Sequence, residues 1–533
     1  MSLNSLPPGL TAWIISHLAE LETTKAPLSH VPKISISQYA STSLQIQHAI
    51  EQRTFSSLRI TSDDLLTFER LVTRRPSRHA LLRHLVFTPV LPAYSVNACT
   101  RFERRADRRR NDEAFSTSLE TLFDVLKPLD EVEGAPRLHL FILPPYSPSD
   151  RAYRDRRLFG TGSNIHDIEI KGDLSNARFA QSYLQIIKSS TVPVLNRISE
   201  FGVASNPRYM APGSIVLLLA NMPHVDRLDL ALYDNEKSKP GLRKQLRFDF
   251  AEALSSTRCS HLARLNLEYL FEDPLDHRFT GTDLRTPTKE TKHDAFSLAL
   301  HRFISSCSSL AWVSLVGPIC VDETLFWPPE SRAHGGQWLG LKHFHAKISC
   351  FRPDGGWYLD GHPGFARDEP SRQYTMDSDS DDDSVHSEFT SVDGAADEAT
   401  PSDNEDDAPA DTYNEHKEAL RIGDAYILNF RSEPTEALER VWVAAARAVN
   451  VMPALCEMTI GVEVSPCPRT ETRSQEFGFS YISQGNPHSE TGVPAPVSQL
   501  HWAAPSGWRM SDDLETLWGQ VLGPEGVVKY EYW

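Results

Sequence analysis

Apolar residues recur along this chain in two alternating patterns. One is a helical stripe with apolar side chains at positions i, i+3, i+4 and i+7, and the other is a short run of the form L-x-x-L-x-L that predicts a buried strand. A helix followed closely by such a strand favours a parallel sheet that is covered by helices through right-handed crossovers. The pattern therefore predicts stacked helix-strand units whose neighbours bury one another's apolar faces.

Nine segments fit the strand pattern, and a weaker copy begins at Leu195. The nine are Phe55/Leu58/Ile60, Leu82/Leu85/Phe87, Ala135/Leu138/Leu140, Ile165/Ile168/Ile170, Val225/Leu228/Leu230, Leu262/Leu265/Leu267, Leu310/Val313/Leu315, Leu341/Phe344/Ala346 and Leu455/Met458/Ile460. The segments that begin at 135, 165, 195 and 225 follow one another at steps of thirty residues. This regular spacing indicates a repeat architecture.

Helical stripes are predicted in residues 115–126, 180–187 and 296–307, each before a strand. The clearest helix follows Pro434, with Thr435 as its expected N-cap. Its buried stripe is expected to be Leu438, Val441, Trp442, Ala445, Ala448, Val449 and Met452. Residues 354–356 (Asp-Gly-Gly) predict a tight turn that joins the strand at Phe344 to residues 357–359 as a hairpin.

The first fifty residues predict a small helical module. Pro7 and Pro8 open a segment in which Leu10, Trp13, Ile14, Leu18 and Leu21 share one helix face, and one or two further short helices follow Pro32. The module is expected to end near Arg53. Residues 55–60 fit either its last helix or, as we prefer, the first strand.

Composition changes sharply in residues 368–412. Residues 377–411 hold fourteen Asp or Glu and no Lys or Arg, which leaves about −3 of the net charge of −17 for the rest of the chain. With few large apolar residues, this segment cannot offset its ordering entropy and is expected to be a disordered insertion. Global charge therefore says little about a ligand of the folded part.

The seven cysteines are scattered without a C-x-x-C pair, which argues against a disulfide framework or a structural zinc site and for a reducing compartment, cytoplasmic or nuclear. No secretory signal or membrane-spanning run is found. Membrane and nucleic-acid partners are not expected.

Both ends of the chain resemble a known family. Residues 6–10 (Leu-Pro-Pro-Gly-Leu), 39–43 (Tyr-Ala-Ser-Thr-Ser) and 50–60 resemble the F-box of fungal F-box-like proteins. Residues 429–434, 452–455 and 508–518 resemble the C-terminal domain of unknown function that is common in that family. The leucine-rich middle matches the family more loosely.

The resemblance implies a substrate-recruiting adaptor of a cullin-RING (SCF-type) ubiquitin ligase. Its F-box helices would dock on a Skp1-type adaptor protein, and its body would hold an unknown protein substrate through protein-protein contacts, without catalysis and without a cofactor. The residues expected to bind the Skp1-type partner are Leu6, Pro7, Pro8, Ile14, Ile15, Leu18, Tyr39, Leu44 and Ile46.

The predicted fold is an α/β leucine-rich-repeat-like solenoid of parallel strands preceded by a small all-α F-box-like module. The expected parts are the module (1–53), the solenoid (54–367), the disordered acidic insertion (368–412) and a C-terminal continuation of the solenoid (413–533). An alternative is a ligase-independent scaffold whose N-terminal helices only cap the solenoid.

Three other clusters of residues have candidate functions. Six arginines in residues 101–110 fit a nuclear-localisation or phosphate-binding patch, a solvated helix face or loop, or a contact with the acidic insertion; we prefer the solvated face. Ser378, Ser380 and Ser402 each precede an acid by three residues, as acid-directed kinases prefer, although an unmodified spacer explains the segment as well. His334, His343, His345 and His362 have metal-like spacing, but no matching Asp, Glu or Cys pattern accompanies them, so no metal site is expected.

No nucleophile elbow, phosphate loop or dinucleotide fingerprint supports an enzyme.

Overall fold

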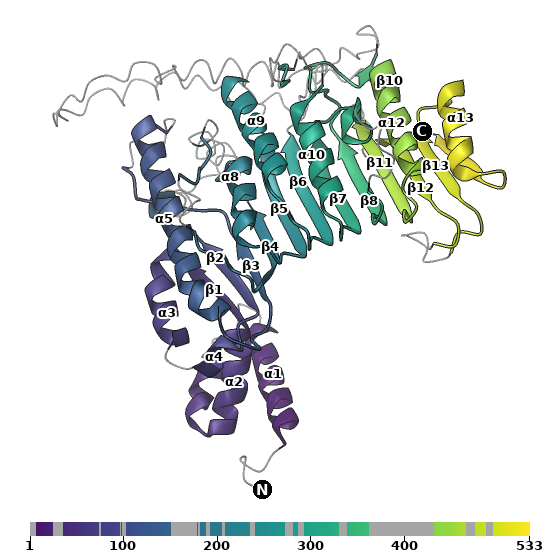
Figure 1. The fold of residues 1–533 in the computed structure, drawn as a ribbon. Coiled ribbons are helices and arrows are strands. Elements are labelled where there is room, and N and C mark those ends of the chain that lie inside the picture. The colour runs from purple at the N-terminus through teal and green to yellow at the C-terminus, as the bar shows by residue number, and fades with distance from the viewer. Residues whose placement is uncertain are drawn as a thin grey trace, which may run out of the picture.

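The computed structural model describes residues 7–24, 36–73, 76–95, 98, 103–150, 179, 182–187, 192–204, 208–234, 240–271, 281–285, 293–329, 338–361, 431–464, 475–486 and 494–532. Their central feature is a mixed sheet of twelve strands that follow one another in chain order (Figure 1). The strands are β1 (Ser57–Thr61), β2 (His84–Thr88), β3 (Leu138–Ile142), β4 (Ile198–Ala204), β5 (Arg227–Asp234), β6 (Arg264–Phe271), β7 (Trp312–Ile319), β8 (His343–Ile348), β11 (Glu457–Val464), β12 (Gln475–Ile482), β13 (Gln499–Ala504) and β14 (Val527–Tyr532). The two-residue strands β9 (Leu359–Asp360) and β10 (Glu433–Pro434) pair with each other, outside the twelve-stranded sheet.

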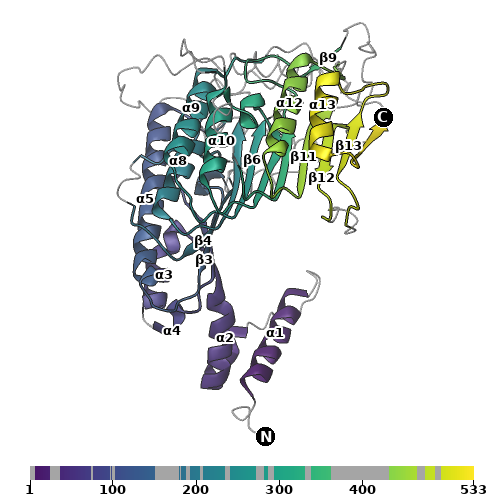
Figure 2. The ribbon, with the colours of Figure 1, turned by 45° about the vertical axis from the view of Figure 1, so that its right-hand side comes forward.

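Helices lie along one face of this curved sheet, and the opposite face carries none among the described residues (Figure 2). The helices of the sheet region are α3 (Leu65–Thr73), α4 (Pro76–His79), α5 (Arg105–Asp130), α8 (Pro212–Leu217), α9 (Pro240–Ser256), α10 (Ala295–Ser306), α12 (Glu436–Asn450) and α13 (Asp512–Leu522). The short 3₁₀ turns η3 (Ser62–Asp64), η6 (Leu218–Asn221) and η7 (Glu323–Leu325) complete the connections. We call the uncovered side of the twelve strands the open face.

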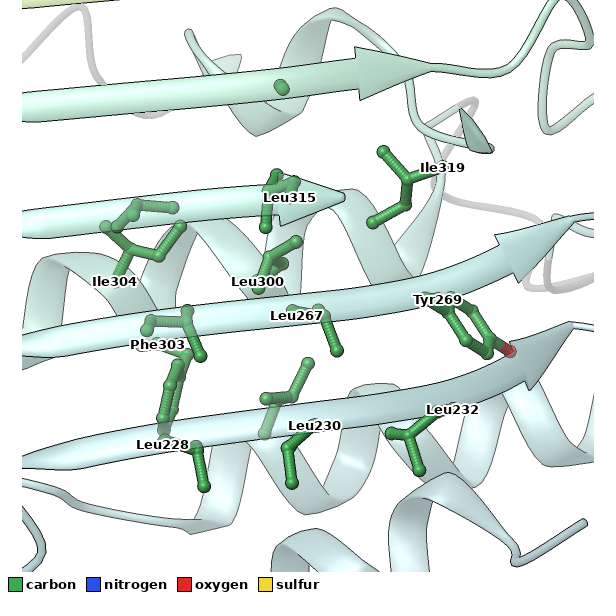
Figure 3. Close-up of a cluster of buried hydrophobic side chains, with 14 of the residues drawn as sticks. Leu228, Leu230, Leu232, Leu267, Tyr269, Leu300, Phe303, Ile304, Leu315 and Ile319 are labelled. Atoms are coloured by element: carbon green, nitrogen blue, oxygen red, sulfur yellow. The ribbon is translucent and has the colours of Figure 1, made fainter. Parts of the chain in front are cut away.

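Alternating side chains of the strands make the core beneath the helices. In β5 every second residue is buried, beginning with Leu228, and the same alternation in β6 and β7 layers leucines against α10 (Figure 3). Leu300 and Phe303 of α10 complete this layer and are almost fully buried. Each such side chain stabilises the fold by about 1.5–3 kcal/mol relative to exposure.

The predicted strands are confirmed with one exception. Eight of the nine segments and the weaker copy at Leu195 coincide with β1 to β8 and β11, and all of these run parallel. Residues 165–170 lie outside the described part. Because β3 pairs directly with β4, the strands that are neighbours in the sheet begin at 138 and 198. The thirty-residue step therefore does not describe this pair.

Three predictions need correction. Residues 182–187 are extended and not helical, because the Leu184 N–H donates to the Tyr209 carbonyl at 2.9 Å and its own carbonyl accepts from Ala211 at 2.8 Å. Phe55 belongs to helix α2 (Leu44–Ser56), so the first strand begins only at Ser57. The turn at Gly355, with φ +83°, closes a bridge between Phe351 and Trp357, but residues 359–360 pair with β10 and not with β8.

The C-terminal strands are not all parallel as predicted. β12 runs antiparallel to both β11 and β13, after which α13 carries the chain to β14, parallel to β13. The helix predicted after Pro434 is confirmed as α12, and the Thr435 hydroxyl accepts from the Leu438 N–H. The acidic insertion lies outside the described residues.

The N-terminal module comprises α1 (Pro8–Thr24), the 3₁₀ turn η2 (Ile36–Ser41) and α2, and it lies at the β1 end of the sheet (Figures 1 and 2). Ile15, Ile46 and Ile50 form its buried centre. Arg78 of the sheet region holds α2 in place, because its guanidinium contacts Glu51 at 2.8 Å and stacks on the Phe55 ring.

Candidate functional site

The open face carries polar and aromatic side chains in rows that cross the strands. Parallel register places Arg264 of β6, Trp312 of β7, His343 of β8 and Glu457 of β11 side by side. The Arg264 guanidinium lies 4.9 Å from the Trp312 ring centre, and the His343 ring lies 4.7 Å from the same tryptophan. Further toward β3 the row continues with Glu200, which contacts His139 at 3.0 Å.

The next row, two residues along each strand, lines a hollow at the β14 end of the open face. It encloses about 700 Å³ and is lined in part by His345, Thr459, Ser480, His501 and Lys529. Thr459 and Ser480 are bonded through their hydroxyls at 3.2 Å. The hollow therefore offers a polar lining on a rigid sheet.

Two facing glycines deepen the hollow. Gly461 of β11 pairs in register with Gly478 of β12. A methyl group on Gly478 would meet the Ile460 carbonyl oxygen at 2.1 Å, and one on Gly461 would collide with the Glu476 side chain. The absence of side chains at this pair lets Glu476 fold across the sheet.

Carboxylates outnumber amines in the lining of the hollow. Glu457, Glu476 and Glu531 face it together with one amine, that of Lys529. Glu457 is the most enclosed of the three, with 5% of its surface exposed. Burial lowers the pKa of His345, while the nearby Glu457 carboxylate acts in the opposite direction. The hollow is therefore suited to a cationic ligand or a cationic part of one.

The second half of the candidate site is the N-terminal module. Of the residues predicted to dock a Skp1-type protein, Pro7, Ile14, Tyr39 and Leu44 are exposed. Ile15 and Ile46 are instead buried in the centre of the module, at 4% and 9% exposure, so they belong to its core and not to a docking surface. Leu6 lies outside the described residues, and the side chains of Pro8 and Leu18 are not described.

The described part of the apolar stripe predicted on the first helix points outward. Leu10, Trp13 and Ile14 are exposed at 49%, 61% and 37%, whereas Thr11 and Ile15 face α2. The Thr11 hydroxyl accepts from the Gln45 amide at 3.1 Å and fixes this orientation. The module thus presents large apolar side chains to solvent.

The arginine cluster forms the first turns of α5. Arg109 pairs with Glu113 at 3.0 Å and Arg110 with Asp107 at 2.5 Å, all along the same helix. Arg104 and Arg105 are exposed, and Arg101 lies outside the described residues. These contacts match the solvated helix face preferred above, in which such pairs contribute little to stability.

A network of buried charges lies near the carboxyl ends of β5 to β7. Arg243 donates to Asp234 at 2.6 Å, and Arg247 donates to Asp294 at 2.6 Å and to the Cys320 carbonyl at 2.6 Å. These guanidinium–carboxylate pairs bind helices α9 and α10 to the sheet. Arg247 Nη1 makes no hydrogen bond within the described residues and lies 3.8 Å from Asp234 Oδ2. Because the pairs join two helices to the sheet inside the fold, we interpret the network as structural.

Sequence reasoning singled out His343 and His345 of the open-face site but not Glu457 beside them. Glu457 opens β11, more than one hundred residues after His345, and the register of β8 with β11 brings it beside His343. The signal in the sequence was the strand at Leu455, whose position beside β8 was not predicted. His334, His362, Ser378, Ser380 and Ser402 lie outside the described residues.

Comparison with known proteins gives no relative from which to transfer a role. No family model matches the chain, no curated protein matches it, and no solved structure matches it. Within the described residues, no helix has the length and apolar character needed to cross a membrane.

Proposed function

We propose that this protein is a non-catalytic, substrate-recruiting adaptor of a cullin-RING ubiquitin ligase of the SCF type. In this proposal the N-terminal module docks on a Skp1-type protein, and the open face of the sheet holds a protein substrate in the cytoplasm or nucleus. The observation that carries it is the exposure of large apolar side chains on the N-terminal module.

Those side chains occur on three consecutive short elements. Leu10, Trp13 and Ile14 of α1, Tyr39 of η2 and Leu44 of α2 are each more than one third exposed, and Leu44 reaches 85%. Leaving this much apolar surface in water is unfavourable by roughly 25 cal/mol for each Å². A partner helix or groove that covers it would recover that free energy, which is how amphipathic helices commonly dock.

The body suits the second half of the proposal. We infer that its chain-ordered parallel strands with helices on one side form a leucine-rich-repeat-like solenoid, in which each unit contacts mainly its neighbours. The strand side of such a body stays free for a macromolecular ligand. The rows around Trp312 and the hollow beside Gly461 provide aromatic and charged contacts on that side.

Binding to a purified Skp1-type protein tests the proposal. The full chain is expected to form a stable complex, and the Ile14→Asp/Leu44→Asp double variant is expected to weaken it at least tenfold, because both side chains would lie in the interface. Leu339→Asp is the matched control, since Leu339 is 57% exposed but lies in the sheet region. A wild-type chain that never binds the Skp1-type protein defeats the ligase proposal.

One observation favours the alternative of a ligase-independent scaffold. α2 runs directly into β1, and Arg78 binds both Glu51 and Phe55, as expected if the module caps the end of the sheet. Deleting residues 1–53 separates the two proposals. An adaptor should keep a folded body that melts near the wild-type temperature, whereas a capped scaffold should lose solubility or several degrees of Tm.

A further inference from the structure

We propose that His343, His345 and Glu457 form a binding site for a divalent transition-metal ion of the zinc type on the open face of the sheet. This inference is independent of the proposed ligase role. It concerns three side chains from two strands that lie far apart in the sequence and adjacent in the sheet.

The backbone places these side chains together. His343 and Glu457 are register partners on the parallel strands β8 and β11, and His345 is two residues further along β8, on the same face. One donor atom from each residue lies within 4.8 Å of the other two. His343 Nδ1 and Glu457 Oε2 are 3.8 Å apart.

These separations are close to those that a metal requires. Tetrahedral bonds of about 2.1 Å put neighbouring donor atoms about 3.4 Å apart, so each pair would have to approach by at most about 1.4 Å. Side-chain rotations on a fixed backbone supply movements of that size. The strands themselves need not shift.

The burial of the carboxylate is the independent observation that points to a cation. Only 5% of the Glu457 surface is exposed, and His343 Nδ1 lies 3.8 Å from Glu457 Oε2, beyond hydrogen-bonding distance. His343 Nδ1 is itself buried without a hydrogen-bond partner in the described part of the chain. A buried carboxylate and an unsatisfied ring nitrogen are both unfavourable alone, and a shared metal ion satisfies both.

The surroundings would hold the imidazoles in place. Both histidine rings pack on Trp312, with ring centres 4.7 Å and 5.3 Å from it. Such packing restricts the ring orientations before a metal arrives, which reduces the entropy lost on binding. Trp312 is therefore a positioning residue and not a ligand.

The donor set defines the class of ion. Two imidazole nitrogens and one carboxylate oxygen suit Zn²⁺ and neighbouring transition metals, whereas Mg²⁺ and Ca²⁺ prefer oxygen donors throughout. Three protein ligands leave a coordination position free. His345 and Glu457 also line the hollow, so this position is accessible to water or to a donor atom of a bound ligand.

The site is tested by titrating ZnCl₂ into the full chain. Metals are first removed from the protein with a chelator and dialysis. Calorimetry is expected to show one saturable site that Glu457→Gln and His345→Gln each weaken at least tenfold. His501→Ala is the matched control, because His501 lines the same hollow outside the three-residue cluster, and it should leave this affinity unchanged.

Two further measurements keep the outcome unambiguous. Circular dichroism of Glu457→Gln should match wild type, since glutamine has nearly the same shape as glutamate. Co²⁺ should give visible tetrahedral absorption with wild type and lose it with Glu457→Gln. Absence of saturable binding in wild type, or equal affinity in wild type and both ligand variants, overturns the site and leaves His343 and Glu457 as neighbouring side chains only.

Discussion

Asp322 shows how a single half-buried acid can make stability depend on pH. Its carboxylate accepts from the Asp294 N–H at 2.9 Å and from the Thr324 N–H at 3.0 Å. Burial, together with the nearby Asp294 and Glu323 carboxylates, raises the pKa of Asp322 to about 7, although the hydrogen bonds from Thr324 and Asp294 oppose the rise. The folded protein therefore holds this proton at pH values where the unfolded chain, with its ordinary pKa of 3.8, has lost it.

The sign of the effect follows from this difference. Stabilisation by the retained proton is fully present below about pH 4 and is lost as the pH rises through about 7. We expect the free energy of unfolding of wild type, relative to Asp322→Asn, to fall with rising pH by up to about 1.4 kcal/mol for each pH unit in this window. Chemical denaturation of both proteins from pH 5 to 8 measures it, and a pH-independent difference would contradict the assignment.

The paired glycines beneath the hollow give a second prediction about individual residues. Gly478→Ala should destabilise the protein by about 1–3 kcal/mol, because the new methyl group meets the backbone of Ile460, which cannot move without disturbing the sheet. Gly461→Ala is the comparison, since its methyl group meets the exposed side chain of Glu476, which can rotate away without moving the backbone. The denaturation midpoint of Gly478→Ala should be lower than that of Gly461→Ala. The reverse order would refute this description of the glycine pair beneath the hollow.

Among the elements, α12 depends on its N-cap residue, Thr435. The Thr435 hydroxyl caps the helix at Leu438 and also donates to the Tyr358 carbonyl at 2.9 Å, which attaches the helix to the segment before the acidic insertion. Thr435→Ala should therefore lower the free energy of unfolding by about 1–2 kcal/mol. Thr516→Ala, an exposed helical threonine of α13, serves as the control and should change stability by less than about 0.5 kcal/mol. Equal effects of the two substitutions would exclude the capping role.

Helix and strand predictions succeeded where a pattern was long and local. α12 carried its cap and its apolar stripe in one continuous segment, and α5 and α10 each carried a continuous apolar stripe. Residues 180–187 failed because Tyr183 and Leu184 find partners near Tyr209, about twenty-five residues away, so tertiary contacts override the local helical spacing. In α1 the spacing correctly predicted a helix but not which face is buried, because that depends on Ile46 and Ile50 of α2.

For the whole molecule, the order of the strands could be predicted from the sequence, but their pairing could be predicted only in part. Nothing local indicates that β12 reverses direction or that β8 and β11 become neighbours across residues 349–456. The contact between His343 and Glu457 follows from that pairing, so histidine spacing alone could not reveal it. The exposed module was predicted as a unit, while its division into Ile15 and Ile46 inside and Ile14 and Leu44 outside required the structure.

We propose that the N-terminal module docks a Skp1-type protein while the open face stays free for a substrate. Hydrogen exchange of the full chain, with and without a purified Skp1-type protein, tests this proposal. We expect new protection in residues 8–24 and 36–56 and unchanged exchange in β5 to β8. Protection confined to the sheet, or none in the module at saturating partner, would contradict it.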